Sequence, residues 1–235
     1  MADASERGQT PPEMGRAGDG RKVDGRSGGG RNRVAEALTR VVARDGIAGV
    51  SVRSVATEAG VTGGTVQHHF ATRAEMIRYA MEWTSLRVEQ RLSTVPHWGE
   101  VSGWTRDLLL ELLPLDDERR REHAVWLAFV AHASTDPTLT ELKRRTNGQL
   151  RALYQRIVAG RRGLPDPTES SGSIESTDPP VPNPDLASDA ALLQALMDGL
   201  SLQLADLEPA EARRLGPELL DRYLALGVHR SDPVD

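Results

Sequence analysis

Apolar residues recur three and four positions apart along most of this chain, and this spacing constrains its fold more than any other feature. A period of this kind gathers apolar side chains on one face of an α-helix, whereas a half-buried strand would alternate apolar and polar residues. Little such alternation is present. We therefore predict an all-α protein. The predicted helices cover residues 31–44, 51–59, 62–69 or 63–69, 72–94, 100–112, 116–133, 137–161 and 188–205.

Prolines set limits on the last helices. Pro96 should end the helix over 72–94, and Pro217 lies within the apolar pattern of residues 209–226. An interior proline lacks the amide hydrogen and clashes with the carbonyl four residues earlier, so it kinks or breaks a helix. We predict a broken pair of helices over 209–226 rather than one continuous helix.

Two segments contain few large apolar side chains. Residues 1–30 are rich in glycine and carry five basic and five acidic residues, and residues 163–185 contain six prolines. Segments of this composition cannot bury enough apolar surface to offset the entropy of ordering. We expect a disordered arm over 1–30 and a mobile loop over 163–185 that joins two helices.

Composition excludes several function classes. The 29 basic and 34 acidic residues give a net charge of −5, so any contact with nucleic acid must be local. The absence of cysteine excludes disulfides, thiolate metal sites and cysteine nucleophiles. No run approaches the roughly 18 apolar residues of a membrane helix, and the start lacks the apolar core of a signal peptide. We expect a cytoplasmic protein with no membrane partner.

Charge is distributed unevenly along the chain. Residues 31–79 hold seven arginines and four acidic residues, whereas residues 80–235 hold 17 basic and 25 acidic residues. This difference indicates that the first unit meets phosphate and that the remainder serves another purpose.

The segment over residues 52–66 has the pattern of a helix-turn-helix. Ala56 is small where two helices must cross closely, Gly60 can adopt a positive φ in the turn, and Val66 returns an apolar side chain to the shared core. Thr62 then caps the second helix. A helical corner in an ordinary bundle is the alternative explanation of this spacing.

The run GVTGGTVQHHFATRAEM, at residues 60–76, resembles the stretch that marks the TetR family of bacterial transcriptional regulators. The resemblance extends over residues 31–80. Weaker similarity at 126–130 and 198–203 is to the C-terminal domain of the BetI-like branch.

The resemblance implies an N-terminal three-helix helix-turn-helix DNA-binding domain over 31–79, followed by a larger helical ligand-binding and dimerisation domain over 80–230. It also implies roles for individual residues. The expected DNA-binding residues are Arg53, Thr62, Gly63, Gly64, Thr65, Gln67, His68, His69 and Arg73.

Three of these residues, Gln67, Arg73 and Gly63, need comment. Gln67 replaces the usual tyrosine, so it could pair with adenine instead of contacting phosphate through a phenol. Arg73 occupies the place of a lysine that grips phosphate at the amino end of a helix. Gly63 and its neighbour Gly64 allow close approach to DNA, unless the helix starts only at Thr65. Phe70 should belong to the core.

The second unit offers a candidate pocket and a candidate dimer interface. All four tryptophans (Trp83, Trp98, Trp104 and Trp126) follow the DNA-binding unit. The candidate pocket residues are Met81, Trp83, Trp104, Trp126, Phe129, His132 and Gln203. The candidate interface residues are Leu193, Met197, Leu200, Leu204, Leu220 and Tyr223. Packing within the chain's own core is the alternative for both sets.

We found no residues arranged for catalysis, a metal or a cofactor. His68 and His69 lack further ligands, and His123 and His132, nine residues apart, lie on opposite faces of one helix. No glycine-rich phosphate loop follows a strand.

We predict a homodimeric repressor that binds a double-stranded, palindromic operator and is released by a small-molecule effector. The alternative is a non-inducible DNA-binding protein with a closed core.

Overall fold

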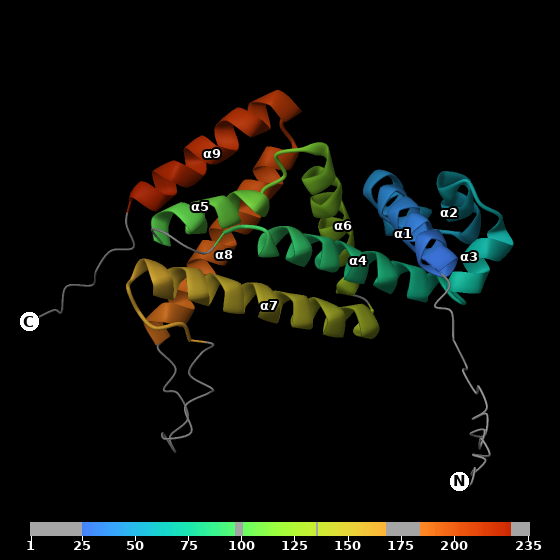
Figure 1. The fold of residues 1–235 in the computed structure, drawn as a ribbon, viewed down its shortest axis with the longest axis horizontal. Helices are drawn as coiled ribbons and strands as arrows, with labels where there is room; N and C mark the ends of the chain where they lie inside the picture. Colours follow the sequence, from blue (N-terminus) through green and yellow to red (C-terminus); the bar gives the residue numbers. More distant parts are fainter. Residues whose placement is uncertain (1–24, 97–100, 135, 168–183, 227–235) are drawn as a thin grey trace, which may run out of the picture.

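The computed structural model describes residues 25–96, 101–134, 136–167 and 184–226, and within these ranges it contains helices and no strand (Figure 1). This confirms the all-α prediction. The helices are α1 (Gly25–Asp45), the short 3-10 helix η1 (Ile47–Gly49), α2 (Val52–Ala59), α3 (Gly63–His69), α4 (Arg73–Ser93), α5 (Val101–Glu111), α6 (Asp117–Ala133), α7 (Pro137–Arg161), α8 (Pro184–Ala205) and α9 (Pro209–Ala225). Residues 1–24 of the predicted arm, residues 168–183 of the predicted loop and Trp98 lie outside the described residues.

Side-chain caps fix several helix starts. Ser51 and Ser54 form a reciprocal capping box at the start of α2, and the Thr62 hydroxyl accepts a hydrogen bond from the Thr65 amide at the start of α3. Thr72 accepts from the Glu75 amide at 3.1 Å. The Glu75 carboxylate accepts from the Ala71 amide at 2.9 Å, one residue before the amide that a capping box would satisfy.

Two helices start earlier than predicted. α1 begins at Gly25 instead of residue 31, and its exposed Arg31 guanidinium lies 4.5 Å from the centroid of the Tyr79 ring. This cation–π contact fixes the second turn of α1 against α4. α8 begins at Pro184 instead of residue 188, and a proline is tolerated there because its missing amide hydrogen would have no partner within the helix.

The predicted break at Pro217 is wrong, since α9 continues through this residue as one helix. Ala212 and Leu220, on either side of the proline, are both fully buried. At Gly216 an added Cβ would lie 2.6 Å from Leu115 Cδ2, so α9 packs very closely on the bundle. Packing on both sides of Pro217 therefore outweighs the loss of one hydrogen bond.

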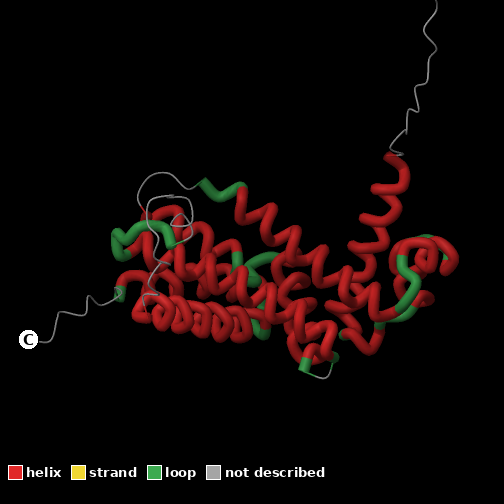
Figure 2. Tube along the Cα trace, turned by 90° about the horizontal axis from the view of Figure 1, so that it is seen from below, coloured by secondary structure: helices red, strands yellow, loops and turns green. Residues whose placement is uncertain are grey.

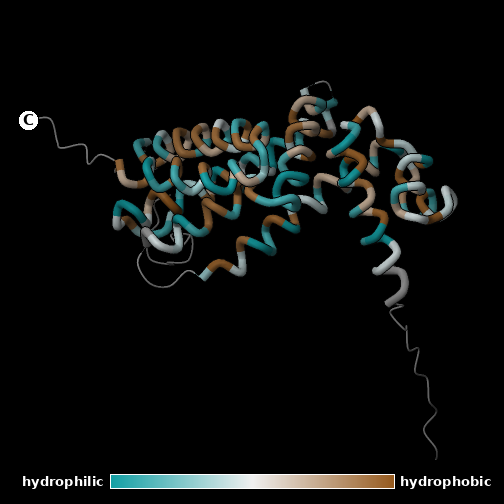
Figure 3. Tube along the Cα trace, turned by 90° about the horizontal axis from the view of Figure 1, so that it is seen from above, coloured by the Kyte–Doolittle hydropathy of each residue, from teal (hydrophilic) through white to brown (hydrophobic). Residues whose placement is uncertain are grey.

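The helices form a small unit at one end of the molecule and a larger bundle. α1, α2 and α3 gather at that end, and α4 runs from it into the bundle (Figures 1 and 2). Single helices carry both apolar and polar residues, as expected for amphipathic helices (Figure 3). No helix in the described segments is long and apolar enough to cross a membrane.

Two buried clusters underlie this division. The first unites α1–α4 with Val125, Phe129 and Ala133 of α6 and with Leu139 of α7. The second lies among α5, α7, α8 and α9. α6 therefore completes the core of the small unit and packs it against the larger bundle.

Candidate nucleic-acid interface and ligand cavity

The turn between α2 and α3 has the geometry that a helix-turn-helix requires. Gly60 adopts the left-handed conformation, with φ 65° and ψ 37°, and the Val61 amide donates to the Ala56 carbonyl at 3.0 Å. Ala56 and Val66 are buried in the core shared by both helices. The predicted roles of these residues in the turn and the core are confirmed.

The outer surface of α3 is polar. Thr62, Gly64, Gln67 and His68 are exposed, whereas Gly63 and Thr65 are half-buried. α3 begins at Gly63, so the alternative of a late start at Thr65 is wrong. The helix contains no acidic residue, and it can therefore approach phosphate without charge repulsion.

The two histidines at the end of α3 differ in environment. His68 is exposed, but His69 is half-buried, and an added Cβ on Gly30 would lie only 3.5 Å from its Nε2 atom. Burial, and then the positive charges of His68 and Arg31, lower the pKa of His69. The lowered pKa favours the neutral ring of His69, whose Nε2 atom lies beside Gly30 of α1.

The basic residues of the small unit differ in the ion pairs and hydrogen bonds that they form. Arg53 is exposed on the first turn of α2. Arg40 and Arg44 both pair with Glu58, at 2.7 and 2.8 Å. The guanidinium of Arg73 donates from Nε to the Val50 carbonyl at 2.8 Å and from Nη2 to the Ile47 carbonyl at 2.6 Å. Arg73, which we predicted to contact phosphate, thus already donates hydrogen bonds to two backbone oxygens.

Phe70 follows α3 and is 1% exposed, which confirms its predicted place in the core. Its ring centroid lies 5.0 Å from that of Tyr79 on α4. The Arg31 guanidinium lies 5.7 Å from the Phe70 ring. Phe70 therefore fixes the end of α3 against α1 and α4.

A cavity of about 770 Å³ lies among α4, α6, α7 and α8, and the end of α5 also contributes to its wall. The wall is mainly apolar and includes Met81, Trp126, Leu150 and Met197. A mainly apolar cavity of this size with a few polar groups is typical of a small-molecule site.

The candidate pocket residues divide between this cavity and other places. Met81 and Trp126 line the cavity. Phe129 is buried in the core of the small unit, and Trp83 stacks on Tyr79 with ring centroids 6.4 Å apart.

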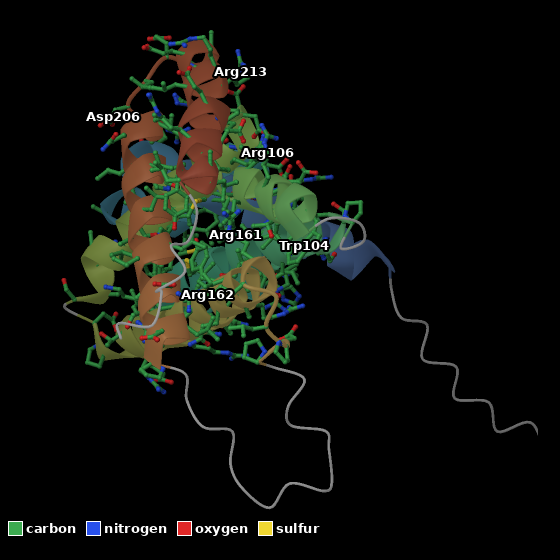
Figure 4. All side chains as sticks on the ribbon, turned by 90° about the vertical axis from the view of Figure 1, so that its left-hand side faces the viewer. Trp104, Arg106, Arg161, Arg162, Asp206 and Arg213 are labelled. Carbon is green, nitrogen blue, oxygen red and sulfur yellow. The ribbon has the colours of Figure 1, made fainter. Side chains whose placement is uncertain are left out.

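Three further candidates also lie away from the cavity. Trp104 lies on α5 and packs against the core of the larger bundle (Figure 4). His132 borders a smaller hollow at the start of α4, and Gln203 is exposed on α8. The apolar spacing identified the helices but not the rotation of each helix about its axis.

Polar groups that sequence reasoning missed also line the cavity. Arg91 donates to the Glu122 carboxylate at 2.5 Å and pairs with Glu111 at 3.0 Å. Burial, and then the charge of Asp198, raise the pKa of the Tyr154 phenol, so this hydroxyl remains a hydrogen-bond donor. In the sequence, these residues could have been noticed only as charged or polar positions on otherwise apolar helix faces.

The candidate interface residues are largely buried in their own chain. Leu193, Met197, Leu200, Leu204 and Leu220 belong to the core of the larger bundle, and Tyr223 packs partly against it. The outward face of α8 instead presents Leu192, 67% exposed, whereas Leu202, 50% exposed, lines the cavity. α8 and α9 lie side by side on the face seen in Figure 4.

The fold and the turn geometry define a helix-turn-helix DNA-binding protein, and comparisons with known proteins identify the family. Residues 35–80 match the family model of bacterial regulatory proteins of the tetR family. Residues 103–228, more than half of the chain, match the model of the C-terminal domain of BetI-type transcriptional repressors. The chain belongs to the TetR family of transcriptional regulators and carries a BetI-type C-terminal domain.

Individual relatives agree with this assignment. The HTH-type transcriptional regulator PksA of Bacillus subtilis is 31% identical over 193 residues, which cover 78% of this chain and 82% of PksA. A transcriptional regulator from a Rhodococcus species is 31% identical, with a TM-score of 0.65 over 85% of this chain and 98% of its own.

A regulator from Saccharomonospora viridis, solved in complex with choline, shares the fold at 21% identity and a TM-score of 0.65, over 84% and 96% of the two chains. The matching families and relatives are transcriptional regulators and not enzymes.

Proposed function

We propose that this protein is a homodimeric repressor that binds a palindromic operator through α3 and leaves it when a small molecule occupies the cavity. The observation that carries this proposal is the position of α4. Its buried Met76 and Ile77 pack in the core of the helix-turn-helix unit, whereas Val88 and Leu92 line the cavity. One helix therefore belongs to both candidate sites.

Release requires an effector that prefers a conformation in which the recognition helices are misplaced. A ligand that displaces Val88 or Leu92 would tilt α4, and Met76 and Ile77 would transmit this tilt to the core beneath α3. Since packed cores shift between discrete arrangements and do not deform continuously, a small displacement in the cavity is enough to disturb DNA binding.

Two copies would associate through the outward face of α8. Leu192 and Ala195 are exposed there, whereas Gly199 and Leu202, further along α8, line the cavity. A small residue beside an exposed leucine allows a second helix to approach closely. A twofold dimer is also what operator geometry needs, because its two recognition helices must enter major grooves about 34–36 Å apart.

Replacement of Thr65 or Gln67 by alanine is expected to change sequence preference, with discrimination at the contacted base pair reduced by about 1–3 kcal/mol. The measurement is a gel shift at a stated salt concentration on the DNA that flanks the protein's own gene, followed by single-base variants of the bound site. Arg144→Ala is the control, because this exposed α7 residue pairs with Glu141 in the same helix. Unchanged base preference in both variants would contradict the assignment.

Filling the cavity separates the repressor from its non-inducible alternative. Leu150 is half-buried on the cavity wall, and Leu150→Trp is expected to retain operator binding but to lose the response to effectors. Compounds, choline among them, would be screened by thermal unfolding. A ligand at a hundred times its Kd should stabilise the wild type by about 2.7 kcal/mol. If no stabilising compound also released the operator, the non-inducible alternative would be favoured.

A further inference from the structure

We propose that Arg73 is a positioning residue for DNA binding. Its guanidinium binds the start of α4 to the connector between α1 and α2, residues 46–51, and it does not act by contacting phosphate. The inference rests on operator binding by α3. It concerns how α3 is held, whereas the proposed function concerns what α3 binds.

The contacts of Arg73 reach far along the chain. Its two acceptors, the carbonyls of Ile47 and Val50, lie 26 and 23 residues earlier, at 2.6 and 2.8 Å. Both acceptor residues have buried side chains in the core of the small unit. The two nitrogens of one rigid guanidinium therefore bind two successive points of the same connector, an arrangement that a single ammonium group cannot reproduce.

The connector in turn fixes α2. Val50 immediately precedes Ser51, the N-cap of α2. The Ser54 hydroxyl on the first turn of α2 donates to the Gly49 carbonyl at 2.8 Å, which ties the other side of the connector to the same helix. Gly46, with φ 68°, begins this segment in the left-handed region. Arg73 thus closes a chain of contacts from α4 through the connector to α2.

The orientation of α3 depends on α2, because Ala56 and Val66 share one core across the Gly60 turn. Loss of the Arg73 contacts would leave two carbonyl groups without their charged donor and would loosen the start of α2. α3 would then reach the groove in a correct orientation for a smaller fraction of the time, and the apparent affinity would fall in proportion.

Salt dependence distinguishes this role from a phosphate contact. The variants are Arg73→Lys, which keeps the charge, and Arg73→Ala, and the comparator is Arg53→Ala, which removes an exposed arginine of α2. Operator affinity would be measured by fluorescence anisotropy over a series of salt concentrations. We expect both Arg73 variants to bind about tenfold more weakly with the wild-type salt slope. Arg53→Ala should make the slope shallower by about 0.9.

A direct contact between Arg73 and a DNA phosphate predicts the opposite pattern. Arg73→Lys would then bind nearly as well as the wild type, and Arg73→Ala would lose about 0.9 of the salt slope. Either result would overturn the proposal.

Hydrogen exchange tests the same contacts without DNA. In Arg73→Lys, the amides of Gly49, Val50 and Val55 should exchange about tenfold faster, while those in the middle of α6 remain unchanged. Arg78→Lys is the matched control, because Arg78 lies on the next turn of α4 and pairs with Glu82 in the same helix. Unchanged exchange in Arg73→Lys would overturn the proposal. Failure of the wild type to bind any operator would instead count against the proposed function.

Discussion

Phe70→Ala is expected to lower the free energy of unfolding by about 3–5 kcal/mol and to abolish operator binding at micromolar protein. The Phe70 ring is 1% exposed and lies 5.0 Å from Tyr79, so its removal would leave a cavity among α1, α3 and α4. The end of α3 has no other aromatic anchor on α4 among the described residues. Stability and recognition should therefore be lost together.

Chemical denaturation followed by circular dichroism measures the first effect, and a gel shift measures the second. His68→Ala is the matched control for stability, since it removes the exposed ring two positions before Phe70 and should change the unfolding free energy by less than about 0.5 kcal/mol. Wild-type stability in Phe70→Ala would mean that the core closes around the lost ring and that Phe70 does not hold α3.

Helix starts could be predicted from the sequence wherever a capping side chain defines them. Ser51, Thr62, Thr72 and Asp116 each accept a hydrogen bond from a backbone amide in the first turn of the helix that follows. These interactions are local, so neighbouring residues contain all the information that they require. The turn at Gly60 was predictable for the same reason.

Tertiary packing decided the cases that local rules missed. Pro217 disfavours a helix, yet α9 continues because Ala212 and Leu220 are buried on either side of it. α1 extends through the glycines that precede Arg31, and the Arg31 guanidinium lies over the Tyr79 ring of α4. In both cases the stabilising partner lies far away in the sequence, and no local propensity could reveal it.

The candidate functional residues also fall into those that a local motif predicts and those that depend on tertiary packing. The exposed positions of α3 follow from one short motif, whereas the cavity wall depends on the rotation of four helices. Trp126 lines the cavity, but Phe129, only three residues later, does not and is buried in the core of the small unit. The contacts of Arg73 could not be predicted either, because its acceptors are backbone carbonyls that every residue possesses.

The double substitution Leu192→Glu and Ala195→Glu is expected to convert the proposed dimer into a monomer and to weaken operator binding by at least about a hundredfold. In a twofold interface each substitution occurs twice, so four carboxylates would be buried close to one another without partners. Linking two DNA-binding units raises the effective concentration of the second, and avidity gains of about 10²–10⁴ disappear when that link is lost.

Leu86→Glu is the matched control, because Leu86 is also an exposed leucine, at 46%, but lies on α4. It introduces one carboxylate per chain, against two in the double variant, and leaves the residues of α8 unchanged. Mass measurement by light scattering should give a monomer for the double variant and a dimer for the control, and only the control should shift the operator at wild-type concentrations. A double variant that remained dimeric would exclude the outward face of α8 as the interface. A monomer with full operator affinity would instead remove the premise that recognition needs two copies of α3, and the palindromic operator would have to be abandoned with it.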